Sequence, residues 1–301
     1  MSMQLRFPTK SHCRSLLLLP IFLLAACGSP PPSQFADFAK LGTALTDSTP
    51  PLLDAAFREA VKTDSLVLSE VRNTLTDRAE RLSMLNDSNA VLKERLVIYG
   101  DLTRHSRLLR SYFVTLGLLA DTSGDSALGD GAKGIVDQLQ NIHPKLSEAQ
   151  LGGAAVGDFL KGAVPVAVGA FRSIALKREL DARAETITSE LDLQQAVLTA
   201  IAEQMRGDIE TRLEQENRER IDEPYLDSGS LPGDWNERRL ESLRTPITLE
   251  AVDAAARASE NLRTSFIALT EGGGAGGSLA QLLQDVSTVV TLVEALKKPM
   301  P

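Results

Sequence analysis

The sequence predicts an all-α protein, an elongated bundle of long antiparallel helices with a Gly/Ala-rich central hairpin. Aromatic residues make up only 4% of the 301 residues, and alanine, leucine, glutamate and arginine are frequent. This composition favours helix over strand. From Gln34 onward, apolar residues recur every three or four positions, which is the helical period. Alternating strand patterns with hairpin turns are absent, so we expect one helical domain over residues 34–301.

Two segments show the helical spacing most clearly, at about 87–121 and 176–221. The second contains no proline and only one glycine, and an unbroken helix of that length would approach roughly 65 Å. Helices this long need neighbours that cover their apolar stripes. The first stripe consists of Leu92, Leu96, Tyr99, Leu102, Leu109, Phe113 and Leu116, and the second of Ile187, Leu191, Leu198, Ile201, Met205, Ile209 and Leu213.

Turn and cap signals divide the remaining chain. Thr49 followed by Pro50 suits a helix N-cap with a first-turn proline, so we expect a helix to start there. Ser147–Gln150 and Ser278–Gln281 both have capping-box spacing, which predicts two further helix starts.

The segment at about 222–248 contains three prolines and is predicted to be an irregular connection. It holds Trp235, the only tryptophan. Our interpretation is that Trp235 pins this connection to the bundle. The alternative is an exposed aromatic anchor for a partner.

The central segment 151–176 is rich in glycine and alanine, and it leaves two interpretations open. Its small residues suit close helix packing in a buried hairpin, or a membrane-active hairpin that stays folded away until triggered. The longest uncharged run, 162–171, has ten residues and includes Pro165, too few to span a bilayer as one helix. The glycines concerned are Gly153, Gly157, Gly162 and Gly169.

The N-terminal segment has the pattern of an export signal. Residues 1–15 contain three basic residues and no acidic residue, and residues 16–26 are almost wholly apolar. A charged region followed by an apolar run of this length is typical of a signal peptide, whereas a spanning helix needs about 20 apolar residues. We therefore expect residues 1–26 to be cleaved off.

The apolar run ends in Leu24, Ala25, Ala26 and Cys27. This motif resembles the lipobox of bacterial lipoprotein precursors. The resemblance implies that a signal peptidase recognises Leu24, Ala25 and Ala26 and cuts before Cys27. It also implies that Cys27 carries a diacylglycerol group and an N-acyl chain such as palmitate, which together suffice for stable membrane anchoring.

The residues after Cys27 indicate where the anchored protein is held. In this family an aspartate at the next position tends to retain the protein on the inner membrane, and this chain has Gly28 there. The resemblance therefore implies the outer membrane, with the body facing the periplasm. Residues 27–33 include three consecutive prolines and are expected to form a short, stiff tether.

Charge and cysteine content exclude several classes of protein. The chain has 32 basic and 40 acidic residues, and three of the basic residues lie in the signal, which leaves 29 against 40 and a net charge of −11 after cleavage. A nucleic-acid partner is therefore not expected. The only cysteines are Cys13, which cleavage removes, and Cys27, which lipid modifies, so no disulfide or thiolate metal site is expected.

No residue pattern indicates catalysis, a metal or a cofactor. The glycine run 272–277 follows a predicted helix rather than a strand, so we expect a turn and not a dinucleotide site. His105 and His143 lie in no metal-binding motif and are expected to be structural or surface residues. The lipid on Cys27 is the only prosthetic group expected.

Three hypotheses for the function remain. The first is a non-enzymatic, membrane-anchored lipoprotein of the cell envelope that acts as a helical scaffold or protein-binding module with an envelope protein as partner. The second is a membrane-active helical protein that uses segment 151–176. The third is a periplasmic hydrolase with an unrecognised carboxylate site.

Overall fold

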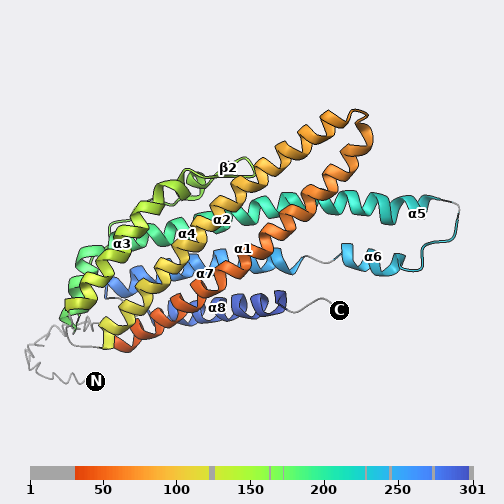
Figure 1. Cartoon of the computed structure of the whole chain (residues 1–301). Helices are drawn as coiled ribbons and strands as arrows, with labels where there is room; N and C mark the ends of the chain where they lie inside the picture. Colours follow the sequence, from red (N-terminus) through yellow and green to blue (C-terminus); the bar gives the residue numbers. More distant parts are fainter. Residues whose placement is uncertain are drawn as a thin grey trace, which may run out of the picture.

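The computed structural model describes residues 31–121, 126–162, 164–171, 173–227, 229–243, 246–272 and 275–297. The all-α prediction is confirmed, because helices dominate these residues (Figure 1). The α-helices are α1 (Pro32–Thr74), α2 (Arg78–Asp121), α3 (Ser126–Ser147), α4 (Ile174–Asn217), α5 (Glu223–Leu226), α6 (Trp235–Ser242), α7 (Ile247–Thr270) and α8 (Gly276–Leu296). The remaining elements are β1 (Gln150–Leu151), β2 (Ala154–Ala155), a 3₁₀ helix (Val156–Phe159) and a π-helical turn (Arg218–Asp222).

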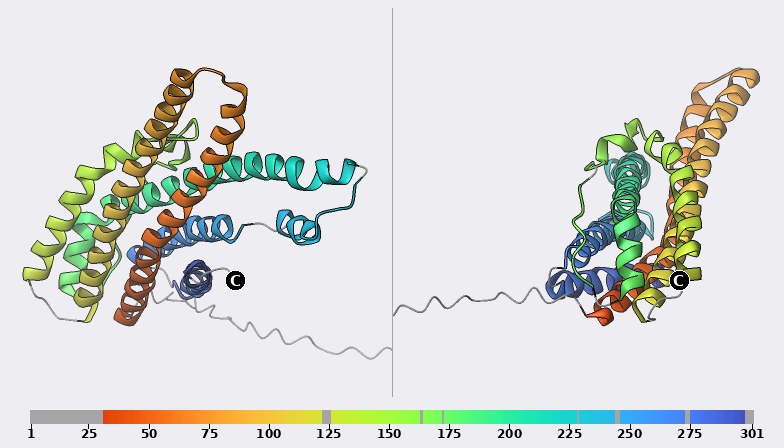
Figure 2. Two further views of the ribbon diagram at one scale, coloured as in Figure 1. Left: turned by 45° about the vertical axis from the view of Figure 1, so that its right-hand side comes forward. Right: turned by 90° about the vertical axis from the view of Figure 1, so that its left-hand side faces the viewer.

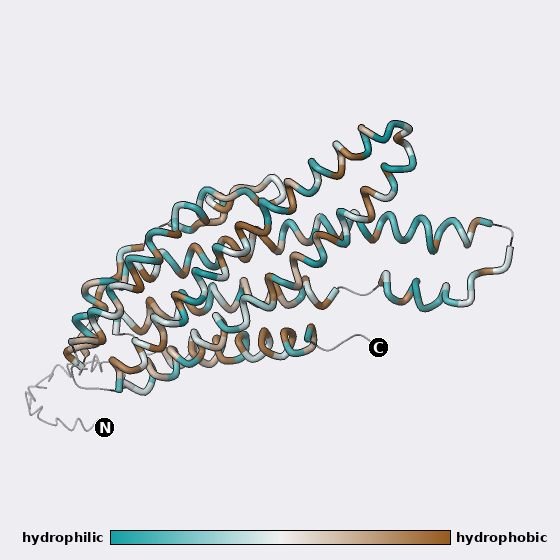
Figure 3. The backbone as a smooth tube through the Cα atoms, in the orientation of Figure 1, coloured by the Kyte–Doolittle hydropathy of each residue, from teal (hydrophilic) through white to brown (hydrophobic). Residues whose placement is uncertain are grey.

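The long helices lie lengthwise in an elongated bundle (Figure 1). The helices α1 and α2 form an antiparallel hairpin, and α4 packs against α7, which in turn packs against α8. Two further views show the α1–α2 hairpin splaying away from α4 toward its tip (Figure 2). In Figure 3 the apolar residues concentrate where helices face one another.

A cluster of aromatic rings lies in the core near the beginning of α1. There Phe38 of α1 packs edge-on against Phe113 of α2, with ring centroids 5.6 Å apart. The ring centroid of Phe266 of α7 lies 5.7 Å from that of Phe38. Aromatic rings from three helices thus hold the two halves of the bundle together.

The central helix α4 is buried on most of its circumference between Ile187 and Ile201. Its start is fixed by Ser173, whose Oγ accepts a hydrogen bond from the Leu176 amide at 3.2 Å and donates one to the Leu119 carbonyl at 3.1 Å. The predicted helices at 87–121 and 176–221 correspond to α2 and to α4 with its π-helical extension. Both long-helix predictions are confirmed.

The predicted helix start at Thr49 is wrong, because α1 runs through Pro50 and Pro51 without a break. Thr49 Oγ1 donates to the Leu45 carbonyl at 3.2 Å, one turn back in the same helix. Leu45 and Leu52 are fully buried on either side of the prolines. Core packing on both sides outweighs the hydrogen bonds that the prolines cannot donate.

The two predicted capping boxes are also misplaced. Ser147 is the last residue of α3, and the chain then enters β1. Ser278 lies inside the first turn of α8, where its Oγ donates to the Ala275 carbonyl at 3.0 Å. The spacing of polar residues matched a capping box, but no helix begins at Ser147, and α8 begins two residues before Ser278.

The central segment 151–176 does not form the expected helical hairpin. Leu151 and Ala154 pair across a two-residue turn formed by Gly152 and Gly153, whose φ angles are +61° and +85°. Positive φ at both turn positions is typical of a tight β-hairpin, and glycine adopts positive φ at little energetic cost. After the 3₁₀ helix, residues 160–171, apart from the undescribed residue 163, form neither helix nor strand and run back along the bundle to the start of α4 (Figure 2).

The four predicted small-residue positions have different roles. Gly153 lies in the β-turn, Gly157 in the 3₁₀ helix, and Gly162 in the irregular segment 160–171 with φ +84°. Close approach is seen at Gly169, whose amide donates to the Thr270 carbonyl at 2.8 Å and whose Cβ, if present, would lie 3.0 Å from the Glu271 backbone. The close contact therefore joins this irregular segment to the end of α7, not two helices.

The connection at 222–248 is more helical than predicted, since it contains α5 and α6. Trp235 Nε1 donates to the Ile221 carbonyl at 3.1 Å, and its ring stacks on Tyr225 with centroids 6.0 Å apart. Through these contacts Trp235 holds α6 against the π-helical turn that follows α4 and against α5.

Candidate functional site

The end of the α1–α2 hairpin stands apart from the other helices (Figures 1 and 2). We call residues 64–97 the arm. None of the arm residues that the structure describes is buried, although the arm contains twelve leucine, valine and methionine residues. Leu82 is 57% exposed, Leu96 51% and Val97 64%. The arm thus presents apolar side chains to solvent over its whole length.

A groove runs along the arm between its two helices. It has a volume of about 660 Å³ and is lined by Val67, Leu68 and Val71 of α1, by Leu75 directly after α1, and by Met84 and Val91 of α2, among others. The lining positions recur every three or four residues on each helix, so the groove follows one face of each. A hydrogen bond from Ser88 Oγ to Asp64 Oδ1 at 2.5 Å joins the two helices at one end.

The base of the arm is tied to α4 by polar contacts. Arg95 Nη1 lies 2.9 Å from Asp208 Oδ2, and Thr63 Oγ1 donates to the Asp208 carbonyl at 3.3 Å. Burial raises the pKa of the Asp208 carboxyl, although Arg95 opposes the shift. These contacts fix the direction in which the arm leaves the body.

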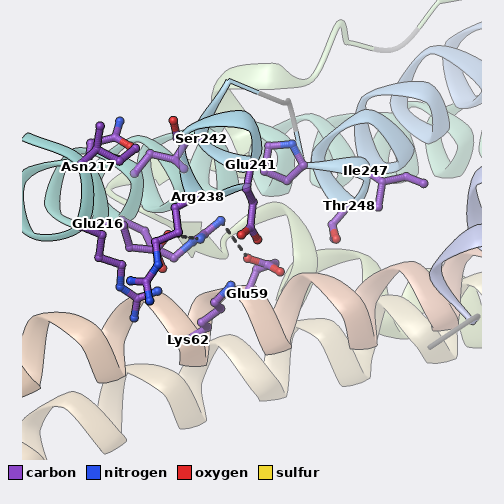
Figure 4. Close-up of a pocket in the computed structure, with 14 residues that line it drawn as sticks. Glu59, Lys62, Glu216, Asn217, Arg238, Glu241, Ser242, Ile247 and Thr248 are labelled. Carbon is purple, nitrogen blue, oxygen red and sulfur yellow. Dashed lines mark hydrogen bonds and ion pairs between the residues drawn. The ribbon is translucent and has the colours of Figure 1, made fainter. Parts of the chain in front are cut away.

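A second hollow, of about 320 Å³, lies between the end of α4, α6 and the middle of α1 (Figure 4). Arg212, only 6% exposed, bonds Glu216 at 2.9 Å and faces Glu59 at 3.7 Å. Glu241 reaches from α6 toward Glu59 in Figure 4. The ion pair of Arg212 with Glu59 joins α4 to α1, near the base of the arm.

Two histidines share one buried carboxylate in the middle of the bundle. His105 of α2 donates from Nε2 to Glu190 Oε2 at 3.0 Å, and His143 of α3 donates from Nδ1 to Glu190 Oε1 at 3.1 Å. The side chain of Glu190 is 2% exposed, whereas that of His143 is 27% exposed. Both carboxylate oxygens are therefore satisfied, and three helices meet at one residue of α4.

The electrostatics of this cluster follow from its hydrogen bonds. Burial alone would raise the pKa of Glu190, but the hydrogen bonds from His105 and His143 outweigh it and hold that pKa below its ordinary value. The hydrogen bond to Glu190 raises the pKa of His143, against the opposing effect of burial. His143 also borders a shallow hollow that includes Gln140 and Ser189. The expectation of structural histidines agrees with these contacts.

The predicted lipidation site lies outside the described residues. This holds for Cys27 and for the peptidase-recognition residues Leu24, Ala25 and Ala26. Among the residues that the structure does describe, no group of three or more histidine, cysteine, aspartate or glutamate side chains is arranged to hold a metal ion.

Sequence reasoning missed Glu190 and the arm. Glu190 lies 47 residues from His143 and 85 from His105, so no local motif could join them. The signal that was available is its position between Ile187 and Leu191, where a carboxylate falls on a buried face. A buried charge of this kind requires partners.

One helix in the described part of the chain, α8, is long and apolar enough to cross a membrane by length and composition, with a mean hydropathy of 1.3. Its buried residues Leu282, Val286, Val289 and Val293 recur at helical spacing and face α1 and α7. This pattern is that of an amphipathic helix packed on the body.

Comparison with known proteins gave no match: no family model, no curated protein and no solved structure is similar to this chain.

Proposed function

We propose that this protein is a non-enzymatic lipoprotein of the bacterial cell envelope, anchored through lipid on Cys27, whose arm binds an envelope protein. In this proposal the anchor lies in the outer membrane and the body faces the periplasm. The bundle acts as a scaffold that holds the arm at a fixed distance and direction from the lipid surface.

The exposed apolar side chains of the arm carry this proposal. A two-helix hairpin that buries none of its residues gains little stability from its own packing, and large exposed apolar surfaces are typical of interaction sites. Fully burying a leucine or valine side chain contributes about 1.5–3 kcal/mol. A partner that covered Leu82, Leu96 and Val97, each about half exposed, would gain several kcal/mol by that measure.

The geometry of α1 fits a tethered binding module. Pro32, the first residue of α1, follows Cys27 by five positions, so a lipid on Cys27 would hold the start of α1 close to the membrane. The arm lies at the opposite end of the same helix (Figure 1). With 43 residues, α1 is about 64 Å long at 1.5 Å per residue, so the arm would reach well into the space beyond the membrane.

Affinity recovery from crosslinked cells tests this proposal. We expect a near-stoichiometric envelope protein to be recovered with the wild-type chain and to be lost when Val67, Leu85, Val91 and Leu96 are all changed to glutamine. The matched control changes four exposed apolar residues elsewhere, Leu226, Leu240, Leu283 and Val290, and should keep the partner. Equal recovery with both variants would contradict the role of the arm.

A further inference from the structure

The groove of the arm is acidic as well as apolar. The charged residues that line it are Asp64, Glu80 and Asp87, and none of its lining residues is basic. Glu80 and Asp87 lie on its α2 side, and Asp64 lies on its α1 side, where it accepts a hydrogen bond from Ser88. An occupant that buried only apolar groups would leave these carboxylates without opposite charges.

The shape of the groove favours a helix as occupant. Its walls are two α-helices, which offer no free strand edge, so a partner must bind through side chains rather than by adding a strand. On the α1 side the lining runs from Asp64 to Leu75, eleven steps along the chain, or about 16 Å at 1.5 Å per residue. That length matches about three turns of helix.

Two polar contacts link the segments that form the groove. Ser88 Oγ of α2 donates to Asp64 Oδ1 of α1 at 2.5 Å. The Arg81 guanidinium of α2 donates from Nε to the Leu75 carbonyl at 2.9 Å, which ties the turn between α1 and α2. The α1 side of the groove is therefore linked to α2 at both Asp64 and Leu75.

We propose that the arm groove binds an amphipathic α-helix of a partner protein, about three turns long, whose apolar stripe is flanked by lysine or arginine. This inference rests on the proposed role of the arm and names the chemistry of its partner. The apolar stripe packs against Val67, Val71 and Met84, and the flanking basic residues pair with the carboxylates of Glu80 and Asp87.

The same charges disfavour the other occupants. An anionic membrane surface would be repelled by three carboxylates. A second copy of this chain docked groove to groove would bring the carboxylates of both copies together, because a two-fold interface uses the same patch on each side. A basic helix avoids both penalties.

Binding of a designed peptide to the purified full-length protein tests the inference. The probe is an 18-residue helical peptide with leucine at i, i+3, i+7 and i+11 and lysine on both sides of that stripe. The control peptide has glutamate in place of each lysine. Fluorescence anisotropy should show the lysine peptide binding at least tenfold tighter than the glutamate peptide. The preference should shrink as salt is raised, because the carboxylates are exposed to screening.

Charge reversal locates the binding. We expect Glu80→Lys with Asp87→Lys to weaken the lysine peptide at least tenfold and to strengthen the glutamate peptide. Glu94→Lys with Glu185→Lys changes the net charge equally at exposed residues outside the groove and should leave the difference between the peptides unchanged. All four residues are exposed, and circular dichroism checks that both variants are folded.

Several outcomes would overturn the inference. Equal affinity for the lysine and glutamate peptides would show that the carboxylates do not select the occupant. Equal affinity of the two charge-reversal variants for the lysine peptide would place the binding site outside the groove. A protein dimer or liposome association that is lost only in the Glu80→Lys and Asp87→Lys variant would identify a second copy or a membrane as the occupant. If an envelope partner were still recovered through the arm, the proposed function would hold although the inference about the groove had failed. Failure of the inference can therefore be distinguished from failure of the proposed function.

Discussion

His143 donates a hydrogen bond from Nδ1 to Oε1 of Glu190 across 3.1 Å, and thereby joins α3 to α4. Because His105 of α2 bonds the other oxygen of the same carboxylate at 3.0 Å, one side chain holds three helices in register. This cluster stabilises the body from which the arm projects.

The cluster predicts a stability that depends on pH. The folded-state pKa of His143 is raised above its ordinary 6.5, so its contribution is complete below pH 6.5 and is lost as pH rises through the raised value. The folded-state pKa of Glu190 is lowered below its ordinary 4.5, so its contribution is complete above pH 4.5 and is lost as pH falls through the lowered value. Both contributions are therefore present between pH 4.5 and 6.5.

Urea unfolding at pH 5.5 and pH 8.5 measures the His143 part. We expect the wild-type protein to lose about 1 kcal/mol more between these two values than His143→Gln does, because a hydrogen bond to a charged donor is stronger by about that amount. Identical pH dependence in the two proteins would rule out this role for His143.

Removing the carboxylate of Glu190 should lower the free energy of unfolding far more than the loss of the His143 hydrogen bond. We expect Glu190→Ala to lower the free energy of unfolding by about 3–5 kcal/mol, since it leaves the buried imidazole of His105 without an acceptor. Glu190→Gln keeps one acceptor oxygen and should cost less. Chemical denaturation compares these with Glu185→Ala, an exposed residue of α4 expected to change stability by no more than about 0.5 kcal/mol. A similar loss in Glu190→Ala and Glu185→Ala would contradict the account.

Two glycines in long helices should respond in opposite directions to alanine. A Cβ at Gly42 would lie 2.7 Å from the Phe113 ring, so Gly42→Ala should destabilise by about 1–3 kcal/mol. A Cβ at Gly100 would meet nothing within 4 Å, so Gly100→Ala should stabilise α2 by about 0.5–1 kcal/mol. Thermal unfolding of the two variants checks the signs, and two shifts of the same sign would show that the packing of α1 on α2 differs from that described.

The proposed anchor makes a separate prediction. Changing Cys27 to alanine should leave residues 1–26 uncleaved and the protein without lipid, because the lipobox cysteine provides the thiol for lipid attachment. Intact-mass measurement and cell fractionation check this, with Cys13→Ala as the control that should be processed normally. Normal mass and membrane retention in the Cys27 variant would disprove lipidation there.

Much of the fold could be predicted because helical periodicity is a local property. The stripes in α2 and α4 extend over many turns, so no single residue decides them. The predicted start at Thr49 failed because packing of Leu45 and Leu52 carries α1 through two prolines, a tertiary effect that a cap pattern does not contain.

The central segment and the candidate site were harder for a related reason. Gly152 and Gly153 are compatible with a tight hairpin as well as with close helix packing, and only the neighbouring structure selects between them. The exposure of the arm could not be predicted from the sequence, because Leu82 and Leu96 have the helical spacing that is typical of buried residues. Only the structure distinguishes an apolar stripe that faces a core from one that faces solvent.

The most direct test of the central claim is site-specific photo-crosslinking in living cells. A photoreactive amino acid replaces Leu85 or Val91 in the arm, or Leu283 on the outer face of α8 as the control, all of them exposed. We predict that the arm positions crosslink to one and the same envelope protein and that Leu283 does not. Crosslinks of equal strength from Leu283 and from the arm, or no crosslink from either arm position, would contradict the account.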